Sequence, residues 1–206
     1  MYDLKYCLER NHDMTNKERF LEICHTTIKR EGLDKVLDWL EKSDFFEAPA
    51  STKFHGNYPG GLLEHSLNVY DCMKRVAKNY PEYPVTDESI AICALFHDVC
   101  KVNFYQKGYR NVKDDATGQW VKKEIYEINE KFPIGHGEKS CIILQWFFGR
   151  LDVAELLAIR YHMGSFDAAV KGGDFGLSRA YESTPLAVML HMADLEASYL
   201  KETNRN

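Results

Sequence analysis

Apolar side chains recur every three or four residues through most of the chain, the spacing that places them on one face of an α-helix. Polar start signals precede several of these stretches, such as Thr15 with Glu18 at capping-box spacing. The pattern predicts helices over residues 16–31, 33–43, 60–77, 86–98, 136–148, 152–161 and 185–201. The helix at 60–77 is apolar over more than half of its circumference, so we expect it at the centre of a helical bundle.

Three stretches break this helical pattern. Residues 45–59 contain Pro and Gly without a sustained period and are predicted to form a loop. Two β-prone stretches, 104–113 and 119–128, flank an Asp- and Gly-rich turn and are predicted to pair as a hairpin. Residues 164–183 are Gly-rich and lack a helical stripe, so we expect a mobile loop there. The predicted fold class is mostly α, a helical bundle with a small β-hairpin insertion at about residues 104–128.

Composition narrows the class of protein and its partners. The 206 residues carry a formal net charge of −5, and 45% of them are hydrophobic. This balance is typical of a globular protein and unlike that of proteins that bind duplex nucleic acid through a basic face. The six cysteines are scattered without a Cys-x-x-Cys pair, which indicates reduced core residues rather than disulfides or a zinc finger. Neither an export signal nor a membrane-spanning apolar run is present, so we expect a cytoplasmic protein.

One stretch joins the most apolar part of the chain to its most reactive side chains. Residues 91–96 lead directly into His97-Asp98, and Lys101 follows one turn later. An imidazole and a carboxylate at the buried end of a helix need a partner that neutralises and coordinates them, and a metal ion meets that need. Other His and Asp residues also stand on or beside apolar helices. The candidate metal ligands are His65, His97, Asp98, His136, His162 and Asp194.

These candidate ligands are spread over separate predicted helices. None of the pairs has the i, i+4 spacing of a zinc site built on one helix, so a shared site must gather its ligands from facing helices. Nitrogen and oxygen ligands suit Mn, Fe, Ni, Co or Zn at a catalytic site better than a structural zinc centre. Taken singly, each histidine has the alternative role of a hydrogen-bonded core or surface residue. The sequence alone does not show that the six side chains converge.

The order of the ligands resembles that of the HD superfamily of metal-dependent phosphohydrolases. The family signature is a His, then an adjacent His-Asp pair, then a later Asp on a final helix. The matching residues are His65, His97, Asp98 and Asp194. The resemblance implies that these four hold one metal, and that Asp98 bridges to a second metal held by His136 and His162, as in the two-metal subset of the family. The implied cofactors are two divalent metal ions per chain, with Mn, Fe, Ni, Co, Zn or Mg as candidates.

A narrower resemblance covers short motifs within about residues 55–200. Gly60-Gly61-Leu62-Leu63-Glu64-His65, Lys101 and Gly135-His136 are similar to the HD domain of bacterial 3′–5′ exoribonucleases. We expect no N-terminal OB-type nucleic-acid module like that of those proteins, because the chain leaves no room for one. It also lacks the Gly-Tyr-Pro signature of cyclic-dinucleotide phosphodiesterases. Both differences argue against those two activities.

Further side chains are candidates for catalysis and substrate binding. Asp98 is the least replaceable, because a carboxylate can span two metals and an imidazole cannot. Lys101 either meets a phosphate oxygen or only complements the dipole at a helix C-terminus. The candidate substrate-binding residues are His55, Lys101, Tyr105, Lys107, Tyr109, Arg110, Lys171 and Arg179. The hairpin side chains suit stacking on a nucleobase, or alternatively packing of their aromatic side on the helices.

These observations favour a metal-dependent phosphohydrolase that cleaves a phosphate ester, of a nucleotide or short oligonucleotide, with metal-activated water. We expect one HD-type domain over residues 1–206, with a helical extension at 1–43 and a core at about 55–203. Its expected partner is a small phosphorylated substrate, not duplex nucleic acid or a membrane. Two alternatives stay open, a diiron oxygenase of the HD-like type and a non-catalytic nucleotide-binding module. The ligands do not distinguish a phosphodiesterase from a phosphomonoesterase.

Overall fold

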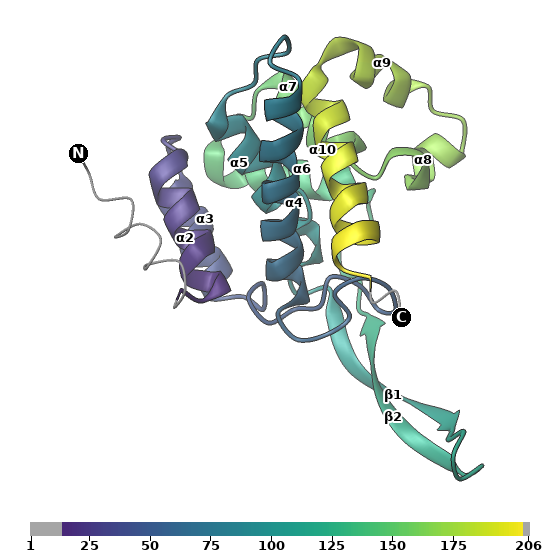
Figure 1. Ribbon diagram of the computed structural model, residues 1–206. Coiled ribbons are helices and arrows are strands. Elements are labelled where there is room, and N and C mark those ends of the chain that lie inside the picture. The colour runs from purple at the N-terminus through teal and green to yellow at the C-terminus, as the bar shows by residue number, and fades with distance from the viewer. Residues whose placement is uncertain (1–13, 204–206) are drawn as a thin grey trace.

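The protein is a bundle of helices from which one β-hairpin projects (Figure 1). The computed structural model describes residues 14–203. The helices are α2 (Asn16–Thr27), α3 (Leu33–Glu41), α4 (Gly61–Asn79), α5 (Asp87–Phe96), α6 (His136–Phe148), α7 (Val153–Tyr161), α8 (Ala168–Lys171), α9 (Gly176–Ser183) and α10 (Pro185–Glu196). The predicted fold class, mostly α with a small hairpin, is confirmed. Within residues 14–203 no helix is both long enough and apolar enough to cross a membrane.

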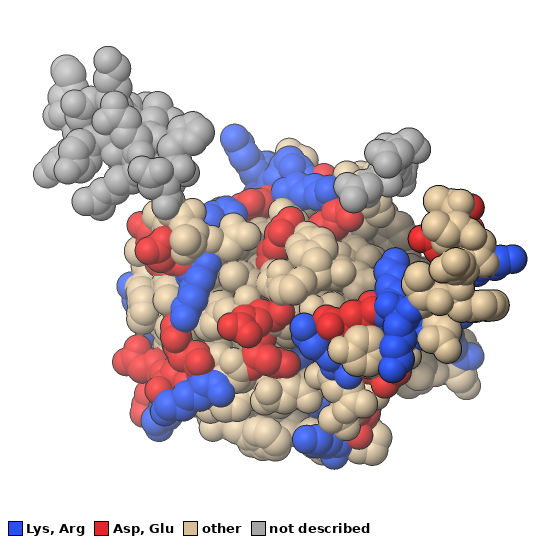
Figure 2. Space-filling view, turned by 90° about the horizontal axis from the view of Figure 1, so that it is seen from below, with Lys and Arg blue, Asp and Glu red and all other residues tan. Residues whose placement is uncertain are grey.

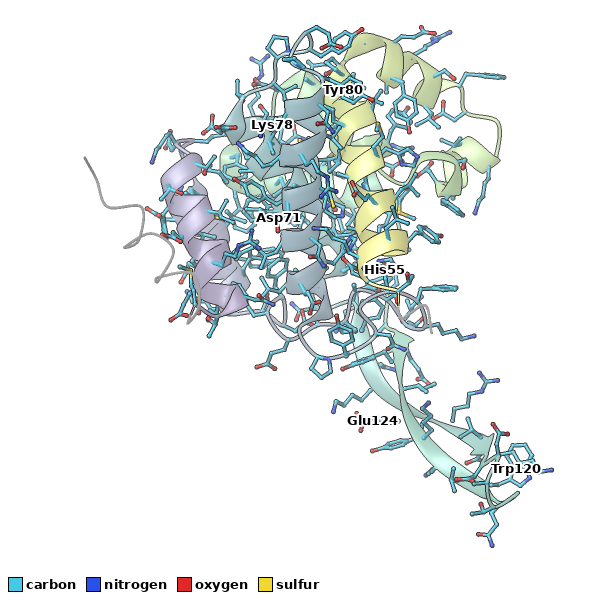
Figure 3. The ribbon with its side chains drawn as sticks, viewed as in Figure 1. His55, Asp71, Lys78, Tyr80, Trp120 and Glu124 are labelled. Carbon is cyan, nitrogen blue, oxygen red and sulfur yellow. The ribbon has the colours of Figure 1, made fainter. Side chains whose placement is uncertain are left out.

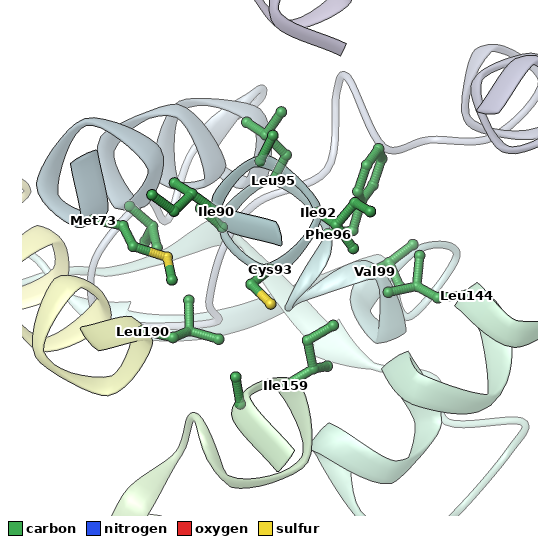
Figure 4. Packing of buried hydrophobic residues seen from close by; sticks show 14 of the residues in the cluster. Met73, Ile90, Ile92, Cys93, Leu95, Phe96, Val99, Leu144, Ile159 and Leu190 are labelled. Atoms are coloured by element: carbon green, nitrogen blue, oxygen red, sulfur yellow. The ribbon is translucent and has the colours of Figure 1, made fainter. Parts of the chain in front are cut away.

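Helix α5 lies at the centre of the hydrophobic core. Every residue from Ile90 to Phe96 is buried, so this helix has no solvent-exposed face along its second half. Figure 4 looks along α5 and shows its side chains pointing outward on all sides, toward Met73 of α4, Ile159 of α7 and Leu190 of α10. A helix that is apolar all round must be surrounded by other elements. The end of α5 is therefore held firmly where His97 and Asp98 follow.

The first helix is shorter than the sequence pattern predicts. Helix α2 ends at Thr27 rather than near residue 31, because Ile28 is extended and buried. The next two residues are held by other helices: the Lys29 N–H donates to Glu88, and Arg30 makes two hydrogen bonds to the Glu155 carboxylate. These partners outweigh the continued helical pattern of the sequence. Helix α3 then begins at Leu33 as predicted and ends at Glu41 rather than residue 43.

The predicted hairpin is present with the predicted pairing. Strands β1 (Tyr105–Lys113) and β2 (Trp120–Ile128) are antiparallel, with Tyr105 opposite Ile128 at one end and Lys113 opposite Trp120 at the other. The hairpin, called the arm below, extends away from the helical body (Figure 1). Its aromatic side does not pack on the helices over most of its length, since Tyr109 and Trp120 are 61% and 72% exposed.

The predicted mobile loop at residues 164–183 is wrong, because this stretch contains ordered short helices. It begins with a 3-10 turn at Gly164–Phe166 and continues through α8 and α9. Asp167 caps α8 by accepting from the backbone N–H groups of Ala169 and Val170. Helix α9 buries Ala180, and its neighbour Tyr181 stacks on His191 of α10. Each helix is too short to produce a recognisable stripe in a Gly-rich sequence.

The final predicted helix reaches Lys201, as expected, but changes its winding on the way. Thr184 caps α10, and Pro185 occupies its first turn. At Ala197 the chain continues as a π-helix, η3 (Ala197–Lys201), which packs beside α4.

The cysteines of the described residues, Cys24, Cys72, Cys93, Cys100 and Cys141, are free and buried, in agreement with the sequence prediction, and Cys7 lies outside the described residues.

Candidate metal centre

Five helices bring the predicted ligands together. His65 comes from α4, His97 and Asp98 from the end of α5, His136 from the first turn of α6, His162 from the end of α7, and Asp194 from α10. We call these six residues the ligand cluster. His65, His97, Asp98 and His162 are almost completely buried. The apolar helices thus place the polar groups at one point inside the bundle.

One oxygen of Asp98 faces His65 and His97, and we call these two residues together with Asp194 the first half of the cluster. Asp98 Oδ2 lies 3.6 Å from His65 Nε2 and 3.5 Å from His97 Nε2. His65 Nε2 is also 3.3 Å from Asp194 Oδ1 and 3.3 Å from His97 Nε2. Two imidazole nitrogens and two carboxylate oxygens therefore point toward one another at the same place.

The other oxygen of Asp98 faces His136 and His162, which we call the second half of the cluster. Asp98 Oδ1 lies 3.4 Å from His136 Nε2 and 3.5 Å from His162 Nε2. The side chains of Asp98, Cys100 and His136 also offer ligand atoms within 4.8 Å of one another. Asp98 turns one oxygen toward each half, as a bridging carboxylate does, and His97, His162 and Asp194 also offer ligand atoms within 4.8 Å of one another.

The cluster fits a divalent metal site. His97 Nδ1 donates to the carbonyl of Ala94 at 2.9 Å and His162 Nδ1 donates to that of Ile159 at 2.7 Å, which leaves each Nε2 lone pair facing inward. Asp98 Oδ1 and His162 Nε2 are buried and have no hydrogen-bond partner among the described residues. Buried acceptors without a donor are costly, and a cation satisfies them.

Charges within the cluster set its proton distribution. Burial alone would raise the pKa of Asp98, but Lys101 and His97 hold that pKa well below its ordinary value. Burial alone would lower the pKa of His65, yet its contacts with Asp194 and Glu202 raise it to about 10. Burial dominates at His97 and lowers its pKa to about 4. The cluster is therefore rich in negative charge that cations or protons must balance.

Residues 62–198, well over half of the chain, match the family profile described as the HD domain. The chain belongs to the HD-domain family. The matched stretch contains all six members of the ligand cluster in the order that the sequence analysis used. HD domains bind divalent metals and are usually metal-dependent hydrolases. The chain matches no curated protein and no solved structure.

Lys101 is part of the interior of this HD domain. Its Nζ lies 2.6 Å from Asp98 Oδ2, and its side chain is only 9% exposed. Burial would lower the pKa of Lys101, but the carboxylate of Asp98 raises it above its ordinary value. Lys101 therefore carries a positive charge beside the carboxylate of Asp98. Its contact with a phosphate oxygen stays a prediction.

Two neighbours of the cluster were not among the predicted site residues. Glu202 accepts from His65 Nδ1 at 3.1 Å and from the side chain of Asn68. Residues 194, 198 and 202 follow one another in four-residue steps, and this spacing was the available signal for Glu202. The second of these neighbours is Cys100, which the sequence pattern predicted to be a core residue. His191 of α10 donates from Nδ1 to the backbone carbonyl of His162 at 2.7 Å.

The predicted substrate-binding residues divide into three groups. His55 lies at the end of the body from which the arm projects (Figure 3), with its ring tilted by 35° against that of His65 and 4.8 Å between the centroids. Lys101 contacts Asp98, and Tyr105 donates to the carbonyl of Ala50. Lys107, Tyr109 and Arg110 stand on the arm rather than in the cluster. Lys171 ends α8 and Arg179 lies exposed on α9. Their roles in substrate binding stay predictions.

A pocket of about 490 Å³ opens beside the second half of the cluster. Its lining includes Gly135, His136, Met163, Phe166 and Ala169. The segment that precedes and forms α8 therefore borders the space beside His136.

Proposed function

We propose that this HD domain is a phosphohydrolase that cleaves a phosphate ester of a nucleotide or a short oligonucleotide at a centre of two divalent metals. The observation that carries the proposal is the position of Asp98, whose two oxygens face two different sets of imidazole nitrogens. His65, His97, Asp98 and Asp194 would hold one cation. Asp98, His136 and His162 would hold the other. Two cations held by these residues would supply Lewis-acid chemistry, polarising a phosphoryl oxygen and lowering the pKa of water.

The side chains around the cluster supply positioning and charge. Lys101 balances part of the negative charge of Asp98 and keeps that carboxylate fixed between the two halves of the cluster. Lys101 also carries a positive charge at the place where a phosphoryl oxygen gains negative charge during cleavage. The buried walls formed by α5 and α7 exclude bulk water from the inner side of the cluster. The pocket beside His136 leaves the outer side open to a substrate.

A nucleotide or oligonucleotide substrate is supported by the groups at the mouth of the site. His55 and Tyr105 offer rings, and the Tyr105 hydroxyl donates to the carbonyl of Ala50 at 3.2 Å, which fixes its ring at the base of the arm. Such rings suit stacking against a base, and Lys101 suits contact with a phosphate. A phosphomonoester and a phosphodiester need the same ligands, so the ester class is left to experiment.

The proposal is tested by hydrolysis of a generic phosphodiester and a generic phosphomonoester, with Mn²⁺, Co²⁺, Ni²⁺, Mg²⁺ or Fe²⁺ added in turn. We expect metal-dependent turnover by the wild type and its loss, together with lower metal content, in Asp98→Ala. Asp34→Ala, which removes an exposed carboxylate on α3, is the matched control and should behave like the wild type. Full activity of Asp98→Ala would contradict the proposal. Bound metal without hydrolysis, accompanied by O₂ uptake, would favour the oxygenase alternative.

A further inference from the structure

The two faces of the arm differ in chemistry. Side chains alternate between the faces of a strand, and directly opposed residues share a face. The pairing of Tyr105 with Ile128 therefore defines one face, called the aromatic face below. It carries Tyr105, Lys107, Tyr109, Asn111, Lys113, Trp120, Lys122, Glu124, Tyr126 and Ile128. All aromatic residues of β1 and β2 lie on it, and the opposite face has none.

Side-chain contacts agree with this assignment. Lys107 Nζ lies 2.8 Å from Glu124 Oε1, and Lys122 Nζ lies over the ring of Tyr109 at 5.3 Å from its centroid. Both contacts cross from one strand to the other on the aromatic face. The one acidic group on this face is thus neutralised by Lys107, and Lys113 and Lys122 leave the face with net positive charge.

Packing against the helical body does not explain why the aromatic side chains of the arm all lie on one face. The arm projects into solvent, with Trp120 labelled at its far end in Figure 3. Cross-strand pairing of rings, which stabilises many hairpins, does not explain it either. The residues opposite Tyr109, Trp120 and Tyr126 are Glu124, Lys113 and Lys107. Among the described residues, no ring–ring contact joins Tyr109, Trp120 or Tyr126 to another aromatic side chain. Trp120 and Tyr109 are largely exposed, and only one face of Tyr109 is covered, by Lys122, so both rings can meet a ligand.

We propose that the aromatic face of the arm binds single-stranded nucleic acid and leads it to the metal centre. Rings separated by lysines suit bases that stack and phosphates that pair with ammonium groups, and they do so for any sequence. The eight residue steps of each strand span about 26 Å, enough for several nucleotides. The inference rests on the proposed function, because it names the class of substrate that the centre would cleave.

The base of the arm touches the ligand cluster. Phe104, which precedes β1, lies with its ring centroid 6.3 Å from that of His136 and under the ammonium group of Lys139 at 5.1 Å. Tyr105, the first residue of the aromatic face, is held at the base of the arm by the hydrogen bond from its hydroxyl to the carbonyl of Ala50. A strand that follows the aromatic face inward therefore arrives at the base of the arm, where Phe104 contacts His136 of the ligand cluster.

Charge argues for a single strand and against a duplex or a protein. In the view from below, acidic and basic side chains are interspersed and do not form one continuous basic surface (Figure 2). A duplex needs many simultaneous phosphate contacts. The centres of protein–protein interfaces are depleted in lysine, whereas lysines separate the rings of this face. A single strand needs only the rings and the few cations present.

The test measures binding by the full chain after treatment with EDTA, so that it does not depend on hydrolysis. The probe is a fluorescently labelled oligonucleotide of mixed sequence and about 12 nucleotides, as DNA and as RNA, followed by anisotropy. We expect saturable binding of at least one single-stranded probe and weaker binding of its duplex. Trp120→Ala should weaken binding by about tenfold, the size of one stacking contact.

Adjacent residues on opposite faces provide matched controls. Lys122→Ala and Lys123→Ala remove the same charge from neighbouring exposed positions, but only Lys122 lies on the aromatic face. We expect Lys122→Ala to weaken binding and Lys123→Ala and Val121→Ala to leave it nearly unchanged. Circular dichroism checks that each variant is folded.

Three results would overturn the inference: no binding of single strands by the wild type, equal effects of the two lysine variants, or a dimer in size-exclusion chromatography that Trp120→Ala dissociates. The wild-type hydrolysis of generic esters reports separately on the proposed function. If the centre hydrolyses those esters and the arm binds no strand, only the further inference fails. If the arm binds and no ester is cleaved, the proposed function fails.

Discussion

At the scale of single residues, the orientation of His65 depends on a carboxylate outside the ligand cluster. Glu202 is nearly inaccessible to solvent at its side chain, and both of its oxygens lie 3.1 Å from His65 Nδ1. This contact keeps a proton on Nδ1, so that a metal that displaced the proton on Nε2 would meet a lone pair directed at Asp98 and Asp194. A carboxylate behind a metal-binding imidazole also raises its basicity.

Replacing Glu202 by Ala is therefore expected to lower the affinity of the chain for Mn²⁺ by about 10- to 100-fold. Glu202→Gln, whose amide oxygen can still accept from Nδ1, should recover most of that affinity. Competition with a fluorescent chelator measures the affinity without any turnover. If the Ala variant bound Mn²⁺ as tightly as the wild type, His65 would be held in place by its other contacts alone.

A physical cause explains why the sequence identified the six predicted ligands but not Glu202. His97 and Asp98 stand out in the sequence because they end a fully apolar helix. Glu202 lies near the C-terminal end of the described chain, directly after the π-helix at Ala197–Lys201. A change of winding alters which face a residue occupies, so the four-residue spacing from Asp194 did not by itself identify Glu202 as a neighbour of His65.

At the scale of elements, the junction between α7 and α8 controls the position of His162. Gly164 has φ of +54°, and a Cβ at this position would collide with the ring of His191. That ring is not free to move away, because it donates to the carbonyl of His162 and stacks on Tyr181. The junction thus connects the backbone beside a predicted ligand to α10.

Gly164→Ala should destabilise the protein more than Gly173→Ala and reduce its metal content. Both changes place a Cβ on a residue with positive φ, so they share a backbone cost of about 1–2 kcal/mol. Only Gly164 adds a collision, which contributes about 1–3 kcal/mol, while a Cβ at Gly173 meets nothing within 4 Å. Urea unfolding and metal analysis check this expectation. Equal stabilities and metal contents would show that His191 does not support His162.

The elements that the sequence predicted well are those with strong local signals. The arm was identifiable because two β-prone stretches flank Asp114-Asp115-Ala116-Thr117-Gly118, and this turn needs no support from the rest of the molecule. Helix α9 was not identifiable, because only Ala180 within it is fully buried and glycines surround it. Helix α2 was predicted too long because contacts of Lys29 and Arg30 with distant carboxylates decide where it ends.

At the scale of the whole molecule, the ligand cluster is a product of the packing of five helices. Residue types and order identified its members, but their convergence depends on how α4, α6, α7 and α10 surround α5. Those packing contacts join residues far apart in the sequence, so the pattern along the chain does not contain them. Metals at this point would connect all five helices at once.

Metal binding should therefore stabilise the whole fold. A ligand that binds only the folded chain at about 100 times its dissociation constant adds about 2.7 kcal/mol. For a domain of this size that free energy corresponds to an increase in Tm of roughly 5–10 °C. We expect EDTA to lower the Tm measured by calorimetry by this amount, and added Mn²⁺ to restore it.

Replacing Asp98 tests whether the stabilising metal binds at the ligand cluster. In Asp98→Asn the neutral amide no longer attracts cations to both halves, so the gain in Tm on adding Mn²⁺ should fall to a small fraction of the wild-type gain. The exposed Asp34→Ala variant should keep the full gain, because Asp34 is far in sequence from every ligand and lies on the surface of α3. An equal gain in all three proteins would place the stabilising cation elsewhere on the molecule. A gain that disappears only in Asp98→Asn would tie the stability of the whole bundle to the two oxygens of one side chain.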